Sequence, residues 1–181
     1  GTLNWEINVE LPTREGLNRL APEKSEERIE GAMGGLKTSI LEGRDAKKKY
    51  RSAPNFAPAG QSTQMIVGAD AATDSDIVRR ANGLYDRFGL RRVYYSAFSP
   101  IPDASAVLPL QRPPLMREHR LYQSDWLMRF YGFKTTEILT PEMPNLDLEL
   151  DPKLAWALRN RQDFPIDVVL EKHLLYIYVR H

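Results

Sequence analysis

The sequence predicts an α/β fold built on a parallel sheet. Three stretches rich in branched and aromatic residues lie at 7–11, 63–67 and 92–98, and helical patterns at 26–41 and 73–88 separate them. Alternation of strand and helix is typical of parallel strands joined by right-handed helical crossovers. We therefore expect three or more parallel strands with crossover helices, followed by extra helices toward the carboxyl terminus.

Composition places the chain among ordinary globular proteins. It has 181 residues, of which 42% are hydrophobic and 27% charged, with a formal net charge of +1. This charge gives no general electrostatic reason for strong nucleic-acid binding. No apolar run approaches the ~20 residues of a spanning helix, and no signal-peptide pattern is present, so we expect a cytoplasmic protein without membrane contact. The chain has no cysteine, which excludes disulfides and thiolate-held metals within it.

The first strand is expected at 7–11, where apolar and polar residues alternate up to Pro12. This alternation places Asn8 and Glu10 on one face. A loop or short turn should follow through residue 22, and then a helix over 26–41 with an apolar face, although glycines weaken it. That face consists of Ile29, Met33, Leu36 and Ile40. The basic segment 44–51 is expected to be solvated surface.

The stretch 56–69 is the most informative part of the chain. Gln61, Thr63 and Gln64 bring uncharged hydrogen-bonding groups to a strand whose residues 65–67 are apolar, as in a covered parallel strand. Polar groups that converge on an apolar wall suit a nucleoside-like ligand. The alternative is a polar turn that leads into an ordinary core strand.

The next two elements carry clear boundary signals. Residues 73–76 supply N-cap chemistry for a helix that runs through Phe88 and stops at Gly89. The strand at 92–98 ends before two prolines. Its Tyr95 and Ser96 approach the carboxyl end, where parallel barrels bind ligands. Simple packing would explain the aromatic residues equally well.

Two further helices are expected near the carboxyl terminus. One spans about 115–131 and ends at Gly132, and the other begins at Asp151 and Pro152 and runs to about residue 161. The inward-facing residues should be Leu121, Trp126, Leu127 and Phe130 in the first and Leu154, Ala155, Trp156 and Leu158 in the second.

Arg117 and Arg120 share one face of the first of these helices and could bind an anion such as a phosphate. The competing interpretation is an ordinary helix surface with Glu118 and Asp125 as partners. His119 has no companion histidine nearby, so no metal site is expected.

The segments at 7–12, 56–69, 93–100 and 117–127, taken together, resemble the radical S-adenosylmethionine (SAM) enzymes. They most closely resemble the group associated with DNA modification or repair, over about residues 5–167. The resemblance implies a partial (β/α) barrel whose fourth, fifth and sixth strands are the three predicted here. It also implies SAM and a 4Fe–4S cluster as cofactors of the full-length protein.

The CxxxCxxC loop that holds this cluster in the family is absent here. The resemblance therefore implies that the cluster-bearing half lies outside this chain, and that the chain alone is inactive. It also implies that Asn8 and Glu10 contact the amino-acid or ribose part of SAM. A buried Glu10 would need a ligand amine or an arginine, or else would form a barrel-lining salt bridge. The expected SAM contacts are Asn8, Glu10, Gln61, Thr63, Gln64, Ile66, Gly68, Tyr95 and Ser96.

We expect three regions: a partial barrel over 1–110, a helical extension packed on it over 111–167, and a divergent tail over 168–181. The tail lacks the helix-hairpin-helix glycines of the related proteins, so a link to nucleic acid rests on the family resemblance alone. Unpaired sheet edges should drive self-association. The alternative function is a noncatalytic nucleotide-binding or interaction domain.

Overall fold

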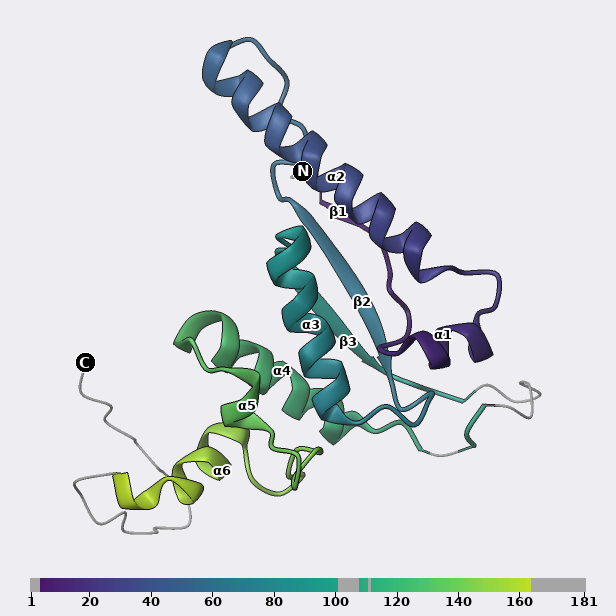
Figure 1. Cartoon of the computed structure of the whole chain (residues 1–181), viewed down its shortest axis with the longest axis vertical. Coiled ribbons are helices and arrows are strands. Elements are labelled where there is room, and N and C mark those ends of the chain that lie inside the picture. Colours follow the sequence, from purple (N-terminus) through teal and green to yellow (C-terminus); the bar gives the residue numbers. More distant parts are fainter. Residues whose placement is uncertain (1–3, 101–107, 111, 164–181) are drawn as a thin grey trace.

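The computed structural model describes residues 4–100, 108–110 and 112–163. Its centre is a three-stranded parallel sheet in the order β1 (Trp5–Glu6), β2 (Gln61–Val67) and β3 (Arg92–Ala97). The helices are α1 (Arg14–Leu20), α2 (Glu26–Lys49), α3 (Asp74–Phe88), α4 (Leu115–Tyr131), α5 (Thr135–Ile138) and α6 (Pro152–Arg159). The prediction of an α/β fold with parallel strands is confirmed (Figure 1).

The main core lies between one face of the sheet and helices α2, α3 and α4. Alternate residues of β2 and β3 point into it, and each is almost fully buried. They pack against Met33 of α2, Ile77 of α3 and Leu121 of α4, among others. The strand residues of this face are Gln61, Thr63, Met65, Val67, Val93 and Tyr95.

The first strand differs from the prediction of a regular strand over 7–11. The ladder comprises Trp5–Glu6, and the next pairing is an isolated bridge from Glu10 to Met65. The N–H groups of Ile7 and Glu10 donate to carbonyl oxygens only two residues apart, those of Ser62 and Gln64. One extra residue on the first segment makes a β-bulge. Glu10 takes a φ of 69° there, a conformation that few residues other than glycine adopt.

The boundaries of α3 and α4 agree with the sequence signals. Thr73 and Asp76 form a reciprocal capping box at the start of α3, and Gly89 ends it at a φ of 64°. Hydrogen bonds from Thr73 lower the pKa of the Asp76 carboxyl. Helix α4 occupies the predicted range and ends at Gly132 in the same left-handed conformation. Local capping chemistry therefore fixes these ends.

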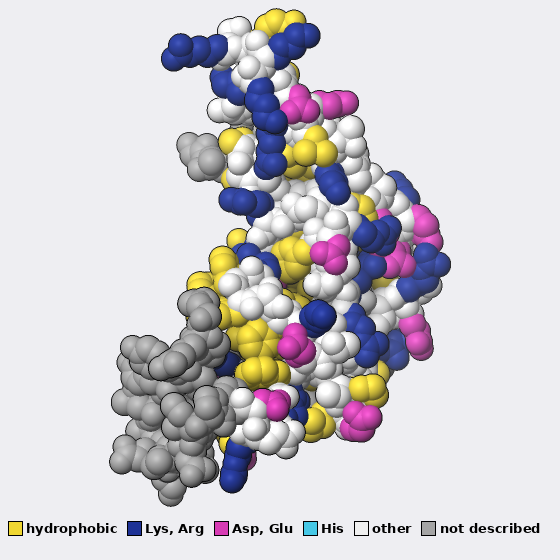
Figure 2. Space-filling view, turned by 60° about the vertical axis from the view of Figure 1, so that its left-hand side comes forward, with side chains coloured by type: hydrophobic (Ala, Val, Ile, Leu, Met, Phe, Trp, Pro, Cys, Tyr) yellow, Lys and Arg dark blue, Asp and Glu magenta, His cyan; other side chains and the backbone are white. Residues whose placement is uncertain are grey.

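Several helices were mispredicted. α2 continues through the basic segment to Lys49, although the exposure of this segment is as expected. Figure 2 shows its Lys and Arg side chains gathered at the protruding end. The expected loop before residue 22 contains α1, capped by Thr13. The short helix α5 was missed as well, because its four residues carry no usable periodicity. The predicted tail, 168–181, lies outside the described residues.

Two of the residues predicted to face inward on α4 are exposed. Trp126 and Phe130 keep 54% and 59% of their surface exposed, and their rings pack on each other at a centroid distance of 4.4 Å. Leu158 of α6 is also exposed. The buried face of α4 instead includes Ser124 and Asp125. Asp125 accepts a hydrogen bond from the Tyr85 hydroxyl of α3 at 2.6 Å, whereas the Ser124 hydroxyl has no partner among the described residues. None of the described helices is long and apolar enough to span a membrane.

Candidate functional site

The second face of the sheet carries mainly polar side chains, and we call it the open face. The strand register places Glu6, Ser62 and Arg92 in one row across it, and Gln64 beside Tyr94 in the next. Arg92 and Tyr94 are exposed, in contrast to the buried residues of the opposite face. The open face comprises Asn4, Glu6, Asn8, Ser62, Gln64, Ile66, Arg92, Tyr94 and Ser96.

The predicted SAM contacts divide between the two faces. Gln64, Ile66 and Ser96 lie on the open face, with Ile66 paired to Ser96. Asn8 joins them, because its neighbours Ile7 and Val9 pack in the core on the other side. Ile66 contacts the small apolar cluster beside α1. Four predicted residues are therefore brought to one surface.

Gln61, Thr63 and Tyr95 point into the core instead, where their exposed fractions are 1%, 0% and 2%. The Gln61 amide nitrogen donates to the carbonyl oxygens of Met33 at 3.2 Å and Phe88 at 2.9 Å, and so ties two helices to the sheet. The Thr63 hydroxyl accepts the Val9 N–H at 3.0 Å. For these residues the structure supports the alternative of an ordinary core strand.

Tyr95 packs its ring edge-on against Tyr122, with ring centroids 5.2 Å apart. Burial raises the pKa of its hydroxyl well above the usual value. The hydroxyl oxygen has no hydrogen-bond partner among the described residues. A ligand on the open face cannot reach this side chain, because the sheet lies between them.

Glu10 finds a partner within the chain. Its carboxylate lies 2.6 Å from the Lys24 ammonium, and both side chains are partly exposed. The prediction offered a ligand amine, an arginine or a salt bridge, and the structure supplies the salt bridge with a lysine. A pair with this exposure contributes about 0–1 kcal/mol to stability.

Asn8 has an unsatisfied acceptor. Its side-chain oxygen is buried, and no described group donates to it. A buried polar atom without a partner costs about 1–3 kcal/mol. A ligand that brought an N–H group to this oxygen would recover that energy, so Asn8 is the best-supported binding residue on the open face.

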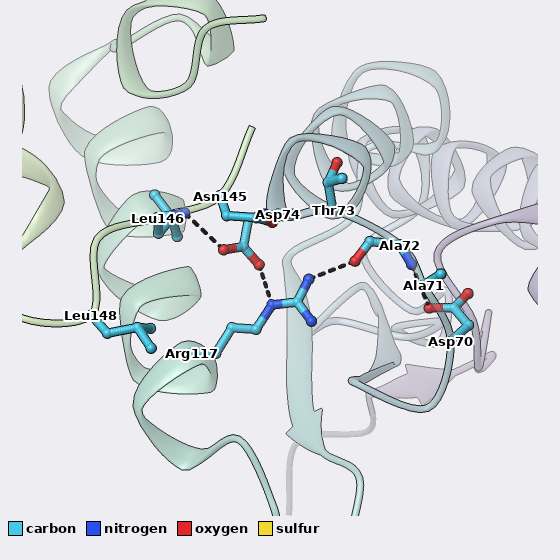
Figure 3. A pocket seen from close by; sticks show the side chains of 9 residues that line it. All are labelled: Asp70, Ala71, Ala72, Thr73, Asp74, Arg117, Asn145, Leu146 and Leu148. Carbon is cyan, nitrogen blue, oxygen red and sulfur yellow. Dashed lines mark hydrogen bonds and ion pairs between the residues drawn. The ribbon is translucent and has the colours of Figure 1, made fainter. Parts of the chain in front are cut away.

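The chain turns sharply at Gly68, directly after β2. Its φ is 86°, and a Cβ atom there would lie 2.8 Å from Cγ of Pro114. Position 68 therefore requires glycine for two reasons: its φ is positive, and Pro114, just before α4, leaves no room for a Cβ atom. The turn leads to a pocket of about 400 Å³ at the carboxyl end of β2. Figure 3 shows its lining residues, Asp70, Ala71, Ala72, Thr73, Asp74, Arg117, Asn145, Leu146 and Leu148.

An ion pair spans this pocket. Arg117 Nε lies 2.5 Å from a carboxylate oxygen of the buried Asp74, and Nη2 donates to the Ala72 carbonyl at 2.6 Å (Figure 3). The second Asp74 oxygen accepts the Leu146 N–H at 2.8 Å. The Asp74 N–H itself donates to Asn145. The start of α3 is thus saturated by protein groups rather than open to a phosphate.

The two arginines predicted to bind an anion have different partners within the chain. Arg117 binds Asp74 and the Ala72 carbonyl, whereas Arg120 holds the segment that follows α5. Arg120 donates to the carbonyl oxygens of Leu148 and Glu149, each at 3.0 Å. The alternative partners, Glu118 and Asp125, were wrong, since Glu118 accepts the Ala97 N–H and Asp125 pairs with Arg129. An anion shared by Arg117 and Arg120 remains a prediction.

Sequence reasoning missed Asp70 and Asp74 as pocket residues. Asp70 accepts hydrogen bonds from the Thr13 hydroxyl and the Ala72 N–H, both at 3.1 Å. Their place in the sequence could have indicated them, since both residues come after β2, and parallel folds bind ligands at the carboxyl ends of their strands. Arg117, the partner of Asp74, lies 43 residues from it in the sequence, so this pairing had no local signal.

Within the described residues, no three His, Cys, Asp or Glu side chains are grouped so as to hold a metal ion. Comparison with protein-family models, with curated proteins and with solved structures found no match to this chain.

Proposed function

We propose that this chain is the SAM-contacting sector of a radical SAM enzyme of the cytoplasm, with its open face lining the interior of a partial (β/α) barrel. One observation carries the proposal: α2, α3 and α4 cover one face of the parallel strands, and the other face presents mainly polar groups, with α1 packed near Ile66. Doubly wound sheets bury both faces and have apolar strands throughout. Barrels instead turn one face of every strand inward.

The chain's residues suit SAM but not the iron–sulfur cluster. Without cysteine, the chain has no thiolate to hold iron, so the cluster ligands would have to come from outside it. For SAM, the open face offers the unsatisfied Asn8 oxygen, the Gln64 amide and the Ser96 hydroxyl. Ile66 adds an apolar contact beside Ser96. When bound with the cluster, SAM would supply the radical chemistry.

Three polar residues of the open face have hydrogen-bonding roles in this proposal. Asn8 would accept an N–H from the ligand, and Gln64 can both donate and accept. Ser96 would hold a hydroxyl or ring nitrogen near the carboxyl end of β3. Action on DNA remains part of the proposal through the family resemblance, and the near-neutral charge of the chain adds no support to it.

A noncatalytic nucleotide-binding domain is the second candidate. It is favoured by the ion pair in the pocket, in which Asp74 and Arg117 satisfy each other. A reacting site usually keeps a titratable group free for the substrate. In this case the open face would bind the adenosine moiety without catalysing a reaction.

Calorimetric titration of SAM into the chain tests the proposal, with Ser96→Ala and Gln64→Met as variants and Ser99→Ala as the matched control on the exposed segment after β3. Loss of one hydrogen bond should weaken binding about tenfold in each open-face variant, and the control should bind like the wild type. Equal binding by all four proteins would overturn it. Adenosine binding as tight as SAM binding would favour the noncatalytic domain.

A further inference from the structure

The end of α2, together with the two residues after it, carries a local excess of positive charge. Residues 44–51, which we call the basic tip, hold five Lys or Arg side chains and one acidic residue, whereas the whole chain has a formal net charge of +1. The rest of the chain is therefore net acidic. Every residue of the basic tip is exposed. The tip extends past the amino-terminal ends of the strands (Figure 1), and its cations project from the surface (Figure 2).

Two cations of the basic tip have partners within the chain. Lys47 Nζ donates to the carbonyl oxygens of Arg51 and Ala53, both at 2.8 Å. Lys48 lies 3.1 Å from a carboxylate oxygen of Asp45. Cations are favourable near the carboxyl end of a helix, where the carbonyl groups are exposed. Stability of the helix therefore accounts for part of this charge, and for Lys47 above all.

The other three cations of the tip, Arg44, Lys49 and Arg51, form no ion pair with a described residue. An aromatic ring lies beside them. Tyr50 is 58% exposed, and Lys49 Nζ lies 5.4 Å from the centre of its ring. Proteins bind single-stranded nucleic acids with this combination, in which cations contact the phosphates and an exposed ring stacks on a base.

The pattern of side chains on α2 disfavours a membrane surface as the partner of the tip. Leu41 is exposed, but it lies one turn from Arg44 and Asp45 and two turns from Lys48, so all four share one face of the helix. A helix that lies in a membrane surface instead keeps its apolar residues apart from its charges. A duplex would offer phosphates but no unstacked base for Tyr50.

We infer that the basic tip binds single-stranded nucleic acid, with Arg44, Lys49 and Arg51 on its phosphates and Tyr50 stacked on a base. This inference goes beyond the proposed function, because the SAM contacts of the open face include no residue of the tip. It uses only the charges and the ring, and so does not depend on the family resemblance. The SAM titrations and the nucleic-acid binding can therefore fail separately.

Fluorescence anisotropy of a labelled oligothymidylate, measured with the whole chain at several salt concentrations, tests the inference. Each phosphate of a single strand that a cation neutralises contributes about −0.7 to the slope of log K against log salt concentration, so three cations predict a slope of about −2. Arg44→Gln combined with Arg51→Gln should bring the slope to about −0.7 and weaken binding roughly 60-fold at about 50 mM salt. Tyr50→Ala should weaken binding about fivefold or more with the slope unchanged, because it removes stacking but no charge.

The matched control combines Arg19→Gln with Arg28→Gln. It removes two exposed arginines from α1 and from the opposite end of α2, and affinity and slope should stay nearly unchanged. Equal weakening by the control would refute the inference, since only overall charge would then matter, and so would a wild type that does not bind at low salt. Tighter binding to the dT·dA duplex, or to phosphatidylserine vesicles, would refute it by assigning the tip to another partner. Circular dichroism should show the wild-type spectrum for every variant, since all the substituted positions are exposed.

Discussion

Tyr122→Phe should destabilise the protein by removing two hydrogen bonds at the outer edge of β3. The hydroxyl of Tyr122 accepts from the Tyr95 N–H and donates to the Tyr95 carbonyl oxygen, both at 3.0 Å. Without this hydroxyl, the N–H and the carbonyl oxygen of Tyr95 lose the partner that they have outside the sheet among the described residues. An unpaired buried polar group costs about 1–3 kcal/mol. Because Tyr122 is only partly buried, water should recover some of this, and we expect a loss of about 2 kcal/mol in total.

Urea unfolding followed by circular dichroism measures this loss. The variant should show a lower midpoint with an unchanged slope, since the ring and its packing on Tyr95 remain. Tyr94→Phe is the matched control, because the Tyr94 side chain is exposed on the open face and its hydroxyl has no hydrogen bond to a described residue. The control should change stability by less than about 0.5 kcal/mol. Equal stability of the two variants would show that water, and not Tyr122, satisfies the strand edge.

Three other predictions concern the pocket and the core. Gly68→Ala should cost about 1–3 kcal/mol in thermal unfolding because of the φ of 86°, whereas Gly35→Ala, in the middle of a helix with open space around it, should be neutral or stabilising. Arg117→Met should cost about 3 kcal/mol in urea unfolding, because it leaves the buried Asp74 carboxylate without its cation; an unchanged midpoint would mean that water reaches the carboxylate. Burial raises the pKa of Tyr95 above that of an unfolded tyrosine, so its contribution is fully present below about pH 10 and should be lost as the pH rises further. A flat stability profile through alkaline pH would contradict the burial of that hydroxyl.

The charged pocket and the open face differ in how far their polar groups are paired within the chain. The ion pair between Asp74 and Arg117 joins the start of α3 to α4, while Asp74 also accepts from the backbone at Leu146. These contacts stabilise the carboxyl end of the sheet. The Asn8 side-chain oxygen on the open face has no partner among the described residues, which is why we propose this face as the ligand-binding surface.

Local chemistry made α3 and α4 predictable. Thr73 and Gly89 are capping residues in the positions that α3 requires, and Gly132 ends α4 in the same way. The branched and aromatic content of the strands likewise located β2 and β3 to within a few residues. Such signals act within four or five residues of one another, and the sequence displays them directly.

The faces of the strands were decided by tertiary structure. Gln61 was expected to contact a ligand. Its side-chain amide instead donates to backbone carbonyl oxygens of α2 and α3, a pairing that exists only because these helices pack against β2. The first strand was shortened by a bulge that depends on pairing with β2.

The sequence by itself determined the class of fold, the parallel direction of its strands and the ends of α3 and α4, since capping and periodicity are properties of neighbouring residues. Only the tertiary structure decided which polar side chains reach the open face, that Tyr122 binds the outer edge of β3, and that Arg117 pairs with Asp74. Those outcomes depend on groups tens of residues apart, whose contact is set by packing rather than by any local pattern.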